Sequence, residues 1–166
     1  MIMPVNIIGW DIGGAHVKVA VVDECGNVTQ VIQRPCHLWK GLNELQLAID
    51  NILKELALKS PRHAITMTGE LVDLFDSRSE GVRTIIATIA EAFDIQPLWI
   101  FAGEHGFIDQ NEIISEHYDA IASANWMASA AYAAEKIESG LFIDIGSTTT
   151  DILKLTSSRV QAEGLT

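Results

Sequence analysis

The chain has 166 residues, 48% of them hydrophobic, and a formal net charge of −11 at pH 7. Length and composition are those of a globular domain with a core of its own, which excludes a chain that is disordered throughout. The negative charge would repel the backbone of DNA or RNA over most of the surface, so we expect no nucleic-acid partner. A small phosphorylated molecule stays compatible, because a bound metal ion and backbone N–H groups reverse the potential locally.

The N-terminal stretch, the apolar runs and the cysteines bear on localisation. No basic residue precedes the first apolar stretch, and no apolar run approaches the roughly 20 residues that a membrane-spanning helix needs. Cys25 and Cys36 fit no C-x-x-C spacing, and a chain with a sufficient core needs no disulfide frame, so both are expected as reduced thiols. We therefore predict a soluble cytoplasmic protein without a membrane partner.

Apolar runs and turn residues predict the first half of the chain as a meander followed by a helix. Three strands joined by tight turns come first and form an antiparallel meander. A helix follows from Leu42 to near Pro61, because its apolar residues recur with a helical period. The predicted strands of the whole chain lie at residues 5–10, 17–23, 28–34, 63–67, 97–101, 141–144 and 151–155.

The second half adds two helices and a new hairpin. Ser77 and Glu80 form a capping-box pattern, and apolar residues continue it as an amphipathic helix to Phe93. An alanine-rich stretch predicts one continuous helix over residues 118–138. The order β-β-β-α-β-α-β-α followed by β-turn-β predicts an α/β fold with a first lobe at residues 1–140 and the start of a second lobe at 141–166.

The phrase Asp-Ile-Gly occurs twice, at residues 11–13 and 144–146, each time at the end of an apolar run and before a second strand. Lys18 and Asp151 occupy equivalent places in the two hairpins. A strand-end carboxylate beside a glycine turn is typical of a site for a metal-bound phosphate group. The duplication therefore predicts two hairpins that face one anion across a cleft.

Asp11 and Asp144 are the candidate catalytic and metal-binding residues, because each carboxylate at a strand end can hold Mg²⁺ on a phosphate substrate. The alternative for each is an aspartate that stabilises a turn. Gly13 and Gly14 are expected to adopt positive φ and to present N–H groups to the anion. Lys18 is expected beside that anion as a point charge, with Asp151 able to pair with it, or else on the polar face of a strand.

The second turn carries four hydroxyl side chains directly after a glycine. Their hydroxyl and N–H groups are candidates to bind a second phosphate, although threonines also start strands. The residues predicted to bind it are Gly146, Ser147, Thr148 and Thr149.

Glu70 follows the fourth predicted strand and is the candidate general base or second metal ligand. The alternative is a glutamate at a helix start. Asn125, within the predicted third helix, either contacts the substrate or bonds to a neighbouring carbonyl.

The order of elements and the two hairpins resemble the actin, Hsp70 and sugar-kinase fold, a ribonuclease H-like architecture whose lobes open with this β-β-β-α-β-α-β-α unit. The hairpin with Asp11 and Lys18 is similar to the first phosphate loop of that superfamily, and the hairpin with Asp144 is similar to the second. The resemblance implies that ATP or another diphosphate compound binds with Mg²⁺ between two lobes.

Four stretches carry a narrower resemblance to hydantoinase A/oxoprolinase-like proteins. They are Gly-Trp-Asp-Ile-Gly-Gly-Ala at 9–15, Thr-Met-Thr-Gly-Glu-Leu at 66–71, Ala-Asn-Trp at 124–126 and Ile-Asp-Ile-Gly-Ser-Thr-Thr-Thr-Asp-Ile at 143–152. They are most similar to the branch linked to tetrahydromethanopterin and methanofuran assembly, which implies a transferase of cofactor biosynthesis that releases diphosphate. Members of that branch have a complete second lobe, so we expect completion by a missing lobe or by a homodimer.

Two other functions stay open on the same scaffold. A sugar- or acetate-type kinase would use Glu70, Asp73 or Asp76 as the carboxylate beside an acceptor hydroxyl. In a non-catalytic, ATP-dependent module like actin or a chaperone, the functional result would be a conformational closure and not a chemical reaction.

Overall fold

The computed structural model describes residues 6–93, 97–145, 150–156 and 159–161. The chain divides into two compact units, Met1–Ala124 and Asn125–Thr166. The predicted lobe boundary after residue 140 refers to the repeat in the sequence and stays a prediction.

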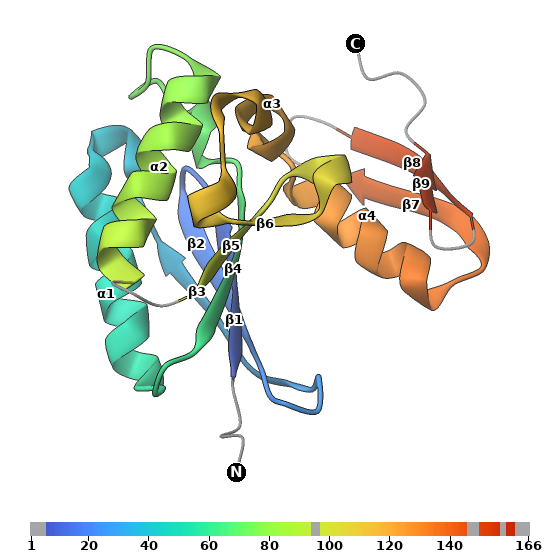
Figure 1. Ribbon diagram of the computed structural model, residues 1–166, viewed down its shortest axis with the longest axis horizontal. Coiled ribbons are helices and arrows are strands. Elements are labelled where there is room, and N and C mark those ends of the chain that lie inside the picture. The colour runs from blue at the N-terminus through green and yellow to red at the C-terminus, as the bar shows by residue number, and fades with distance from the viewer. Residues whose placement is uncertain (1–5, 94–96, 146–149, 157–158, 162–166) are drawn as a thin grey trace. The chain divides into compact units, whose positions relative to one another are not determined.

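The first unit is built on a mixed sheet of six strands in the order β3-β2-β1-β4-β5-β6 (Figure 1). β1, β2 and β3 form the predicted antiparallel meander. β4 pairs in parallel with β1 and β5 in parallel with β4, whereas β6 runs antiparallel to β5. The strands are β1 Ile7–Ile12, β2 His16–Val22, β3 Val28–Pro35, β4 Arg62–Met67, β5 Leu98–Phe101 and β6 Phe107–Asp109.

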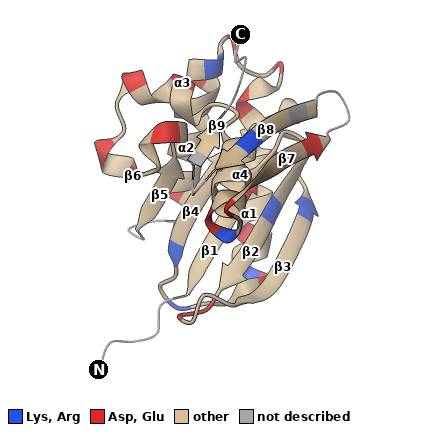
Figure 2. Cartoon of the chain, turned by 90° about the vertical axis from the view of Figure 1, so that its right-hand side faces the viewer, with Lys and Arg blue, Asp and Glu red and all other residues tan. Residues whose placement is uncertain are grey.

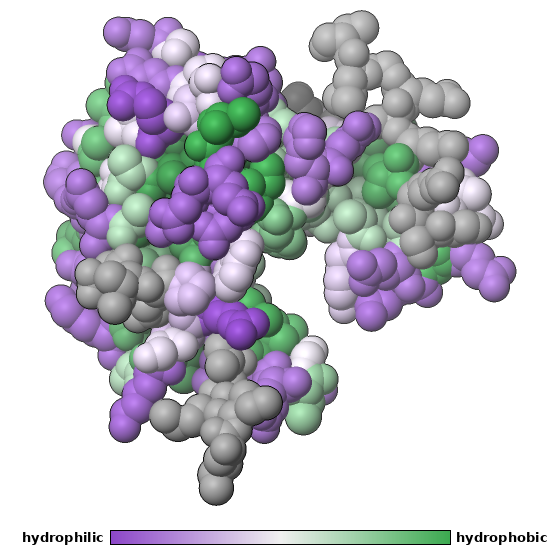
Figure 3. Space-filling model, viewed as in Figure 1, coloured by the Kyte–Doolittle hydropathy of each residue, from purple (hydrophilic) through white to green (hydrophobic). Residues whose placement is uncertain are grey.

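Helices α1 (Leu42–Leu56) and α2 (Arg78–Phe93) lie on one face of this sheet, as Figure 1 shows. Alternate residues of the strands bury their side chains there, and in β1 these are Ile8, Trp10 and Ile12. The helices bury one apolar stripe each, so their outer surface is largely hydrophilic in Figure 3. The intervening strand residues therefore point to the opposite face.

The predicted start of α2 is confirmed, with one difference in the capping box. The N–H of Glu80 donates to Oγ of Ser77 at 3.2 Å, which satisfies one of the free donors of the first helical turn. The Glu80 carboxylate accepts from the N–H of Asp76 at 2.9 Å, one residue earlier than in a standard capping box.

The prediction of one continuous helix over residues 118–138 is wrong. The structure has a short α3 (Tyr118–Ile121), a break, and then α4 (Asn125–Lys136). Ser123 in the break has φ of 54°, a left-handed conformation that interrupts the helical hydrogen bonds. The hydroxyl of Ser123 is held by Glu70, so a tertiary contact overrides the helix propensity of the alanines.

Several short elements were not predicted. β6 returns along the edge of the sheet after a turn at Gly106, whose φ is 70°. Single turns of 3₁₀ helix occur at η1 Leu38–Lys40, η2 Gly69–Leu71, η3 Gly103–His105, η4 Gln110–Glu112 and η5 Ser115–His117.

The second unit consists of α4 and a three-stranded antiparallel sheet in the order β7-β8-β9. α4 packs on one face of this sheet through Ala130 and Ala134, which form a small core with Leu153 and Leu155. The strands are β7 Ser139–Ile145, β8 Thr150–Thr156 and β9 Arg159–Gln161.

The distribution of charged residues and the polarity of the helices reflect the acidic composition of the chain. Figure 2 shows acidic residues spread over helices, strands and turns rather than gathered in one place. Within the part of the chain that the structure describes, every helix is too short or too polar to cross a lipid bilayer.

Candidate functional site

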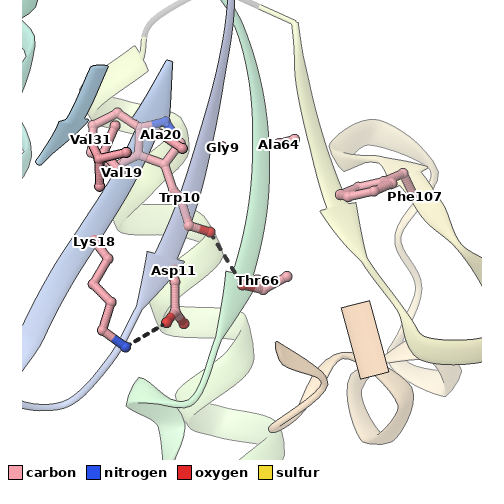
Figure 4. A pocket seen from close by; sticks show the side chains of 10 residues that line it. All are labelled: Gly9, Trp10, Asp11, Lys18, Val19, Ala20, Val31, Ala64, Thr66 and Phe107. Atoms are coloured by element: carbon pink, nitrogen blue, oxygen red, sulfur yellow. Dashed lines mark hydrogen bonds and ion pairs between the residues drawn. The ribbon is translucent and has the colours of Figure 1, made fainter. Parts of the chain in front are cut away.

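Asp11 and Lys18 form an ion pair near the end of the β1–β2 hairpin. The two residues are direct partners in the antiparallel register, and Nζ of Lys18 lies 3.0 Å from Oδ2 of Asp11 (Figure 4). The lysine side chain is half exposed, whereas Oδ1 of Asp11 is buried and has no hydrogen-bond partner among the residues that the structure describes. Because Lys18 occupies only one oxygen, the other oxygen of this carboxylate can accept a further donor or bind a cation.

Gly13 and Gly14 form the turn that follows Asp11, but neither has positive φ, so that part of the prediction is wrong. The lack of room for a Cβ atom explains why glycine stands at both positions. A Cβ atom on Gly13 would lie 2.9 Å from the carbonyl oxygen of His16, and one on Gly14 would lie 2.5 Å from Cγ1 of Val72. The N–H of Gly13 also donates to that His16 carbonyl at 3.0 Å, which closes the hairpin.

A pocket of about 310 Å³ lies on the face of the first sheet opposite α1 and α2, and Figure 4 shows its lining. Its floor is made of the small residues Gly9, Ala20 and Ala64, which are neighbours across β2, β1 and β4. The Asp11–Lys18 pair lines the pocket together with Phe107, which is about half exposed. The floor is thus flat and apolar, and the charged residues of the lining are Asp11 and Lys18.

Glu70 lies in η2, directly after β4, and its side chain is completely buried. Oε1 accepts a hydrogen bond of 2.6 Å from Oγ of Ser123, and Arg78 lies 3.8 Å from the same oxygen. Oε2 is buried, and none of the described residues forms a hydrogen bond with it. A carboxylate in this position holds segments of the first unit together. Its predicted role as general base or metal ligand stays a prediction, and these contacts favour a structural role.

Ser123 and Arg78 belong to this cluster and were missed in the sequence. Arg78, at the start of α2, donates to Oγ of Ser123 at 2.9 Å, so the serine bridges the arginine and the glutamate. The available signal was the pair Ser123 and Asn125 inside an alanine-rich run, because both residue types are favoured at helix starts. Asn125 indeed begins α4, where its Oδ1 accepts the N–H of Trp126 at 2.8 Å.

The second hairpin repeats the first at the level of the backbone. Asp144 pairs with Asp151 in the register of β7 and β8, just as Asp11 pairs with Lys18. Asp144 is exposed, and the side chain of Asp151 is not described. The predicted ligands at 146–149 lie outside the described residues, so the convergence of the two hairpins on one anion stays a prediction.

The donor set at Asp11 suits magnesium better than zinc. Among the described residues, no three His, Cys, Asp or Glu side chains cluster as a metal site. Mg²⁺ is commonly held by one or two carboxylates together with substrate phosphates and water, so a single carboxylate with a free oxygen fits it. Lys18, beside the same carboxylate, would contribute a positive charge next to such an ion.

Solved structures place the fold among actin-like ATPases and sugar kinases. The chain is similar to a ROK family transcriptional regulator described as a homologue of the E. coli Mlc protein, with a TM-score of 0.57, 14% identity, and coverage of 96% of this chain and 38% of that one. It is also similar to a ROK family glucokinase from Streptomyces griseus, solved with glucose and AMPPNP, with a TM-score of 0.52, 15% identity, and coverage of 94% and 46%. At these identities the likeness concerns the fold alone.

A sequence relative supports a narrower assignment. The chain is 35% identical over 162 residues to the (4-{4-[2-(gamma-L-glutamylamino)ethyl]phenoxymethyl}furan-2-yl)methanamine synthase of Methanocaldococcus jannaschii, which aligns with 97% of this chain. The chain spans 47% of the length of that relative. The family model described as Hydantoinase/oxoprolinase matches residues 62–164, which is more than half of the chain. The chain therefore belongs to the hydantoinase/oxoprolinase family.

Proposed function

We propose that this chain carries the first phosphate-binding hairpin of a cofactor-biosynthesis enzyme, which binds a diphosphate compound with Mg²⁺ at Asp11. The observation that carries the proposal is the Asp11 carboxylate beside a glycine turn. One oxygen lies 3.0 Å from Lys18, and the other is buried with no partner in the described part of the chain. The M. jannaschii synthase, whose name describes a furan methanamine product, supports the assignment to cofactor assembly.

Each residue has a defined task in this proposal. Asp11 holds the metal through its free oxygen, and Lys18 offers its ammonium to an oxygen of the diphosphate. The bound ion supplies charge neutralisation, so that diphosphate is a better leaving group. Residues 146–149, which lie outside the described residues, and Asp144 are proposed to bind phosphate in the second hairpin.

Calorimetry on the 166-residue chain, with a variant at Asp11, tests the role of the first hairpin. Inorganic diphosphate is titrated with Mg²⁺ present and, in a second titration, with Mg²⁺ omitted. We expect binding that requires Mg²⁺ and falls at least tenfold in Asp11→Asn, whereas Asp50→Asn, an exposed carboxylate on α1, retains the wild-type affinity. Equal affinity of the Asp11→Asn variant and the wild type would overturn the proposal.

The nature of the phosphate compound is resolved in the same assay. We expect inorganic diphosphate to compete with ATP for one site, because the proposed contacts are to phosphate oxygens and not to a base. Binding of ATP with no competition by diphosphate would instead favour a kinase-type site that recognises the nucleoside.

A further inference from the structure

The carboxyl end of β4 lies directly beside the Asp11 hairpin. β1 and β4 are parallel neighbours, and Asp11 pairs with Thr66 in their register (Figure 4). One residue beyond β4, the N–H of Thr68 donates to the carbonyl of Ile12 at 2.9 Å, which continues the pairing of the two strands. The residues that follow β4 are therefore held against the glycine turn that follows β1.

The side chains of β4 alternate between the two faces of the sheet, and this alternation continues to Thr68. Ala64, Thr66 and Thr68 are partly exposed, whereas the residues between them are buried. Ala64 and Thr66 line the pocket together with Asp11. Thr68 therefore follows them on the side of the sheet that carries the Asp11 carboxylate.

Thr68 lies next to Gly13, which has no side chain to separate the threonine hydroxyl from the hairpin. A Cβ atom on Gly13 would lie 3.7 Å from Oγ1 of Thr68 and 2.9 Å from the carbonyl oxygen of His16. Because glycine stands here, the backbone of the turn and the Thr68 hydroxyl border the same space. Gly13 comes two residues after Asp11, so this space adjoins the carboxylate to which the diphosphate is assigned.

The two threonines at this strand end differ in what their hydroxyls contact. Oγ1 of Thr66 donates to the carbonyl of Trp10 at 3.3 Å. Thr68 stands directly before η2, where a threonine side chain usually accepts an N–H of the helix, but its side chain forms no such bond. The partly exposed Thr68 hydroxyl can therefore donate to a ligand.

Glu70, which the sequence singled out at this strand end, is placed differently. Its side chain is completely buried, and Oε1 accepts the hydrogen bond from Ser123. Thr68, and not Glu70, is thus the residue after β4 whose polar atom lies at the hairpin.

We infer that Thr68 is a further phosphate-binding residue, whose hydroxyl donates to an oxygen of the diphosphate held at Asp11. Lys18 on β2 and Thr68 after β4 then contact the anion from the two sides of Asp11, because β1 lies between those strands. A hydrogen bond to an ionised oxygen is short and strong. This contact rests on the proposed function, since it concerns the same ligand.

Calorimetry with Mg²⁺ and inorganic diphosphate tests this contact on the 166-residue chain. Thr68→Val keeps the shape of the side chain without its hydroxyl, and we expect about tenfold weaker binding, as suits the loss of one hydrogen bond to a charged group. Thr68→Ala is expected to bind as weakly as Thr68→Val, whereas Thr68→Ser keeps the hydroxyl and the wild-type affinity. The matched control is Thr29→Val on β3, whose hydroxyl donates to the carbonyl of Val21 at 3.3 Å and whose loss leaves the affinity unchanged.

Mg²⁺ without diphosphate distinguishes a ligand of the anion from a ligand of the metal. We expect Thr68→Val to bind Mg²⁺ alone as tightly as the wild type, because its hydroxyl contacts the anion. A parallel loss of Mg²⁺ affinity would overturn the inference, since Thr68 would then hold the metal. Urea unfolding of the same variants shows whether a lost affinity reflects a lost fold, which would also remove the affinity for Mg²⁺.

The results separate this contact from the function on which it rests. Wild-type diphosphate affinity in Thr68→Val and Thr68→Ala would overturn the contact, while weaker binding in Asp11→Asn would still support the proposed function. Equal weakening in Thr29→Val would also overturn the contact, because the effect would not belong to the hydroxyl beside the hairpin. A wild-type chain that binds no diphosphate would overturn the proposed function and this contact together.

Discussion

The hydroxyl of Ser123 donates a hydrogen bond of 2.6 Å to Oε1 of Glu70, although the two residues are 53 positions apart in the sequence. Glu70 follows β4, and Ser123 occupies the break between α3 and α4. The bond therefore fixes the end of the first unit to the loop that lies next to the Asp11 hairpin, where the N–H of Thr68 donates to the carbonyl of Ile12 at 2.9 Å.

Ser123→Ala is expected to lower the free energy of unfolding by about 1–3 kcal/mol, because a buried carboxylate oxygen loses a donor. Ser123→Gly removes the same hydroxyl but accepts the φ of 54° without strain, so its loss is expected to be smaller by about 1 kcal/mol. Urea unfolding of both variants measures the two effects. Wild-type stability in both would show that the bond contributes nothing.

The lack of room for a side chain in the glycine turn leads to a second prediction. Gly14→Ala brings a Cβ atom to 2.5 Å from Cγ1 of Val72, and the overlap is expected to cost about 1–3 kcal/mol of stability. Val72→Ala removes the opposing atom, so the double variant is expected to be more stable than the sum of the two single effects. Gly13→Ala meets the His16 backbone instead, and Val72→Ala does not rescue it. A double-mutant cycle by urea unfolding measures the coupling, and simple additivity would contradict the contact.

Lys18→Met separates the two tasks proposed for the Asp11 site. Loss of the ammonium frees the second Asp11 oxygen, so the affinity for Mg²⁺ alone is expected to rise by about fivefold, as suits a partly exposed ion pair worth roughly 1 kcal/mol. The affinity for diphosphate with Mg²⁺ is expected to fall, because the anion loses a positive charge. Calorimetry of both ligands checks the opposite signs, with Lys54→Met on α1 as the control. A change of the same sign for both ligands would refute the division of roles.

Much of the first unit was predictable because its patterns are local. Alternation in β1 and β2 and the helical period from Leu42 follow from which side chains face the core, and the structure confirms the meander and both helices. β6 was missed because a strand of three residues carries too little periodicity to be recognised. The fold class followed from the order of elements, which the structural comparisons bear out.

The site was predictable only in part, because some of its features depend on distant residues. The aspartate and the glycines were recognised from the repeated phrase, yet the close approach of Val72 to Gly14 is a tertiary contact that no local pattern contains. The break at Ser123 likewise could not be predicted from the local sequence. Alanine favours helix on both sides of it, and the residue that stabilises the left-handed conformation is Glu70, in another element.

The two cysteines provide a prediction with an internal control. Cys36 is 1% exposed, and burial, helped by the charge of Glu44, raises the pKa of its thiol from 9.0 to about 11, whereas Cys25 is exposed. At about pH 8 we expect iodoacetamide to modify Cys25 and to leave Cys36 intact, since the thiolate is the reactive form. Mass spectrometry of the native chain identifies the modified residue, and equal labelling of both would contradict the burial of Cys36.

The raised pKa of Cys36 also predicts a dependence of stability on pH. Because the folded pKa lies above the unfolded value, the thiol stabilises the fold below about pH 9, and this contribution is lost as the pH rises toward 11. The free energy of unfolding in urea should therefore fall more steeply over that range in the wild type than in Cys36→Ala. Cys25→Ala should keep the wild-type slope, since Cys36 is intact in it. A wild-type slope in Cys36→Ala would mean that other groups cause the alkaline loss of stability.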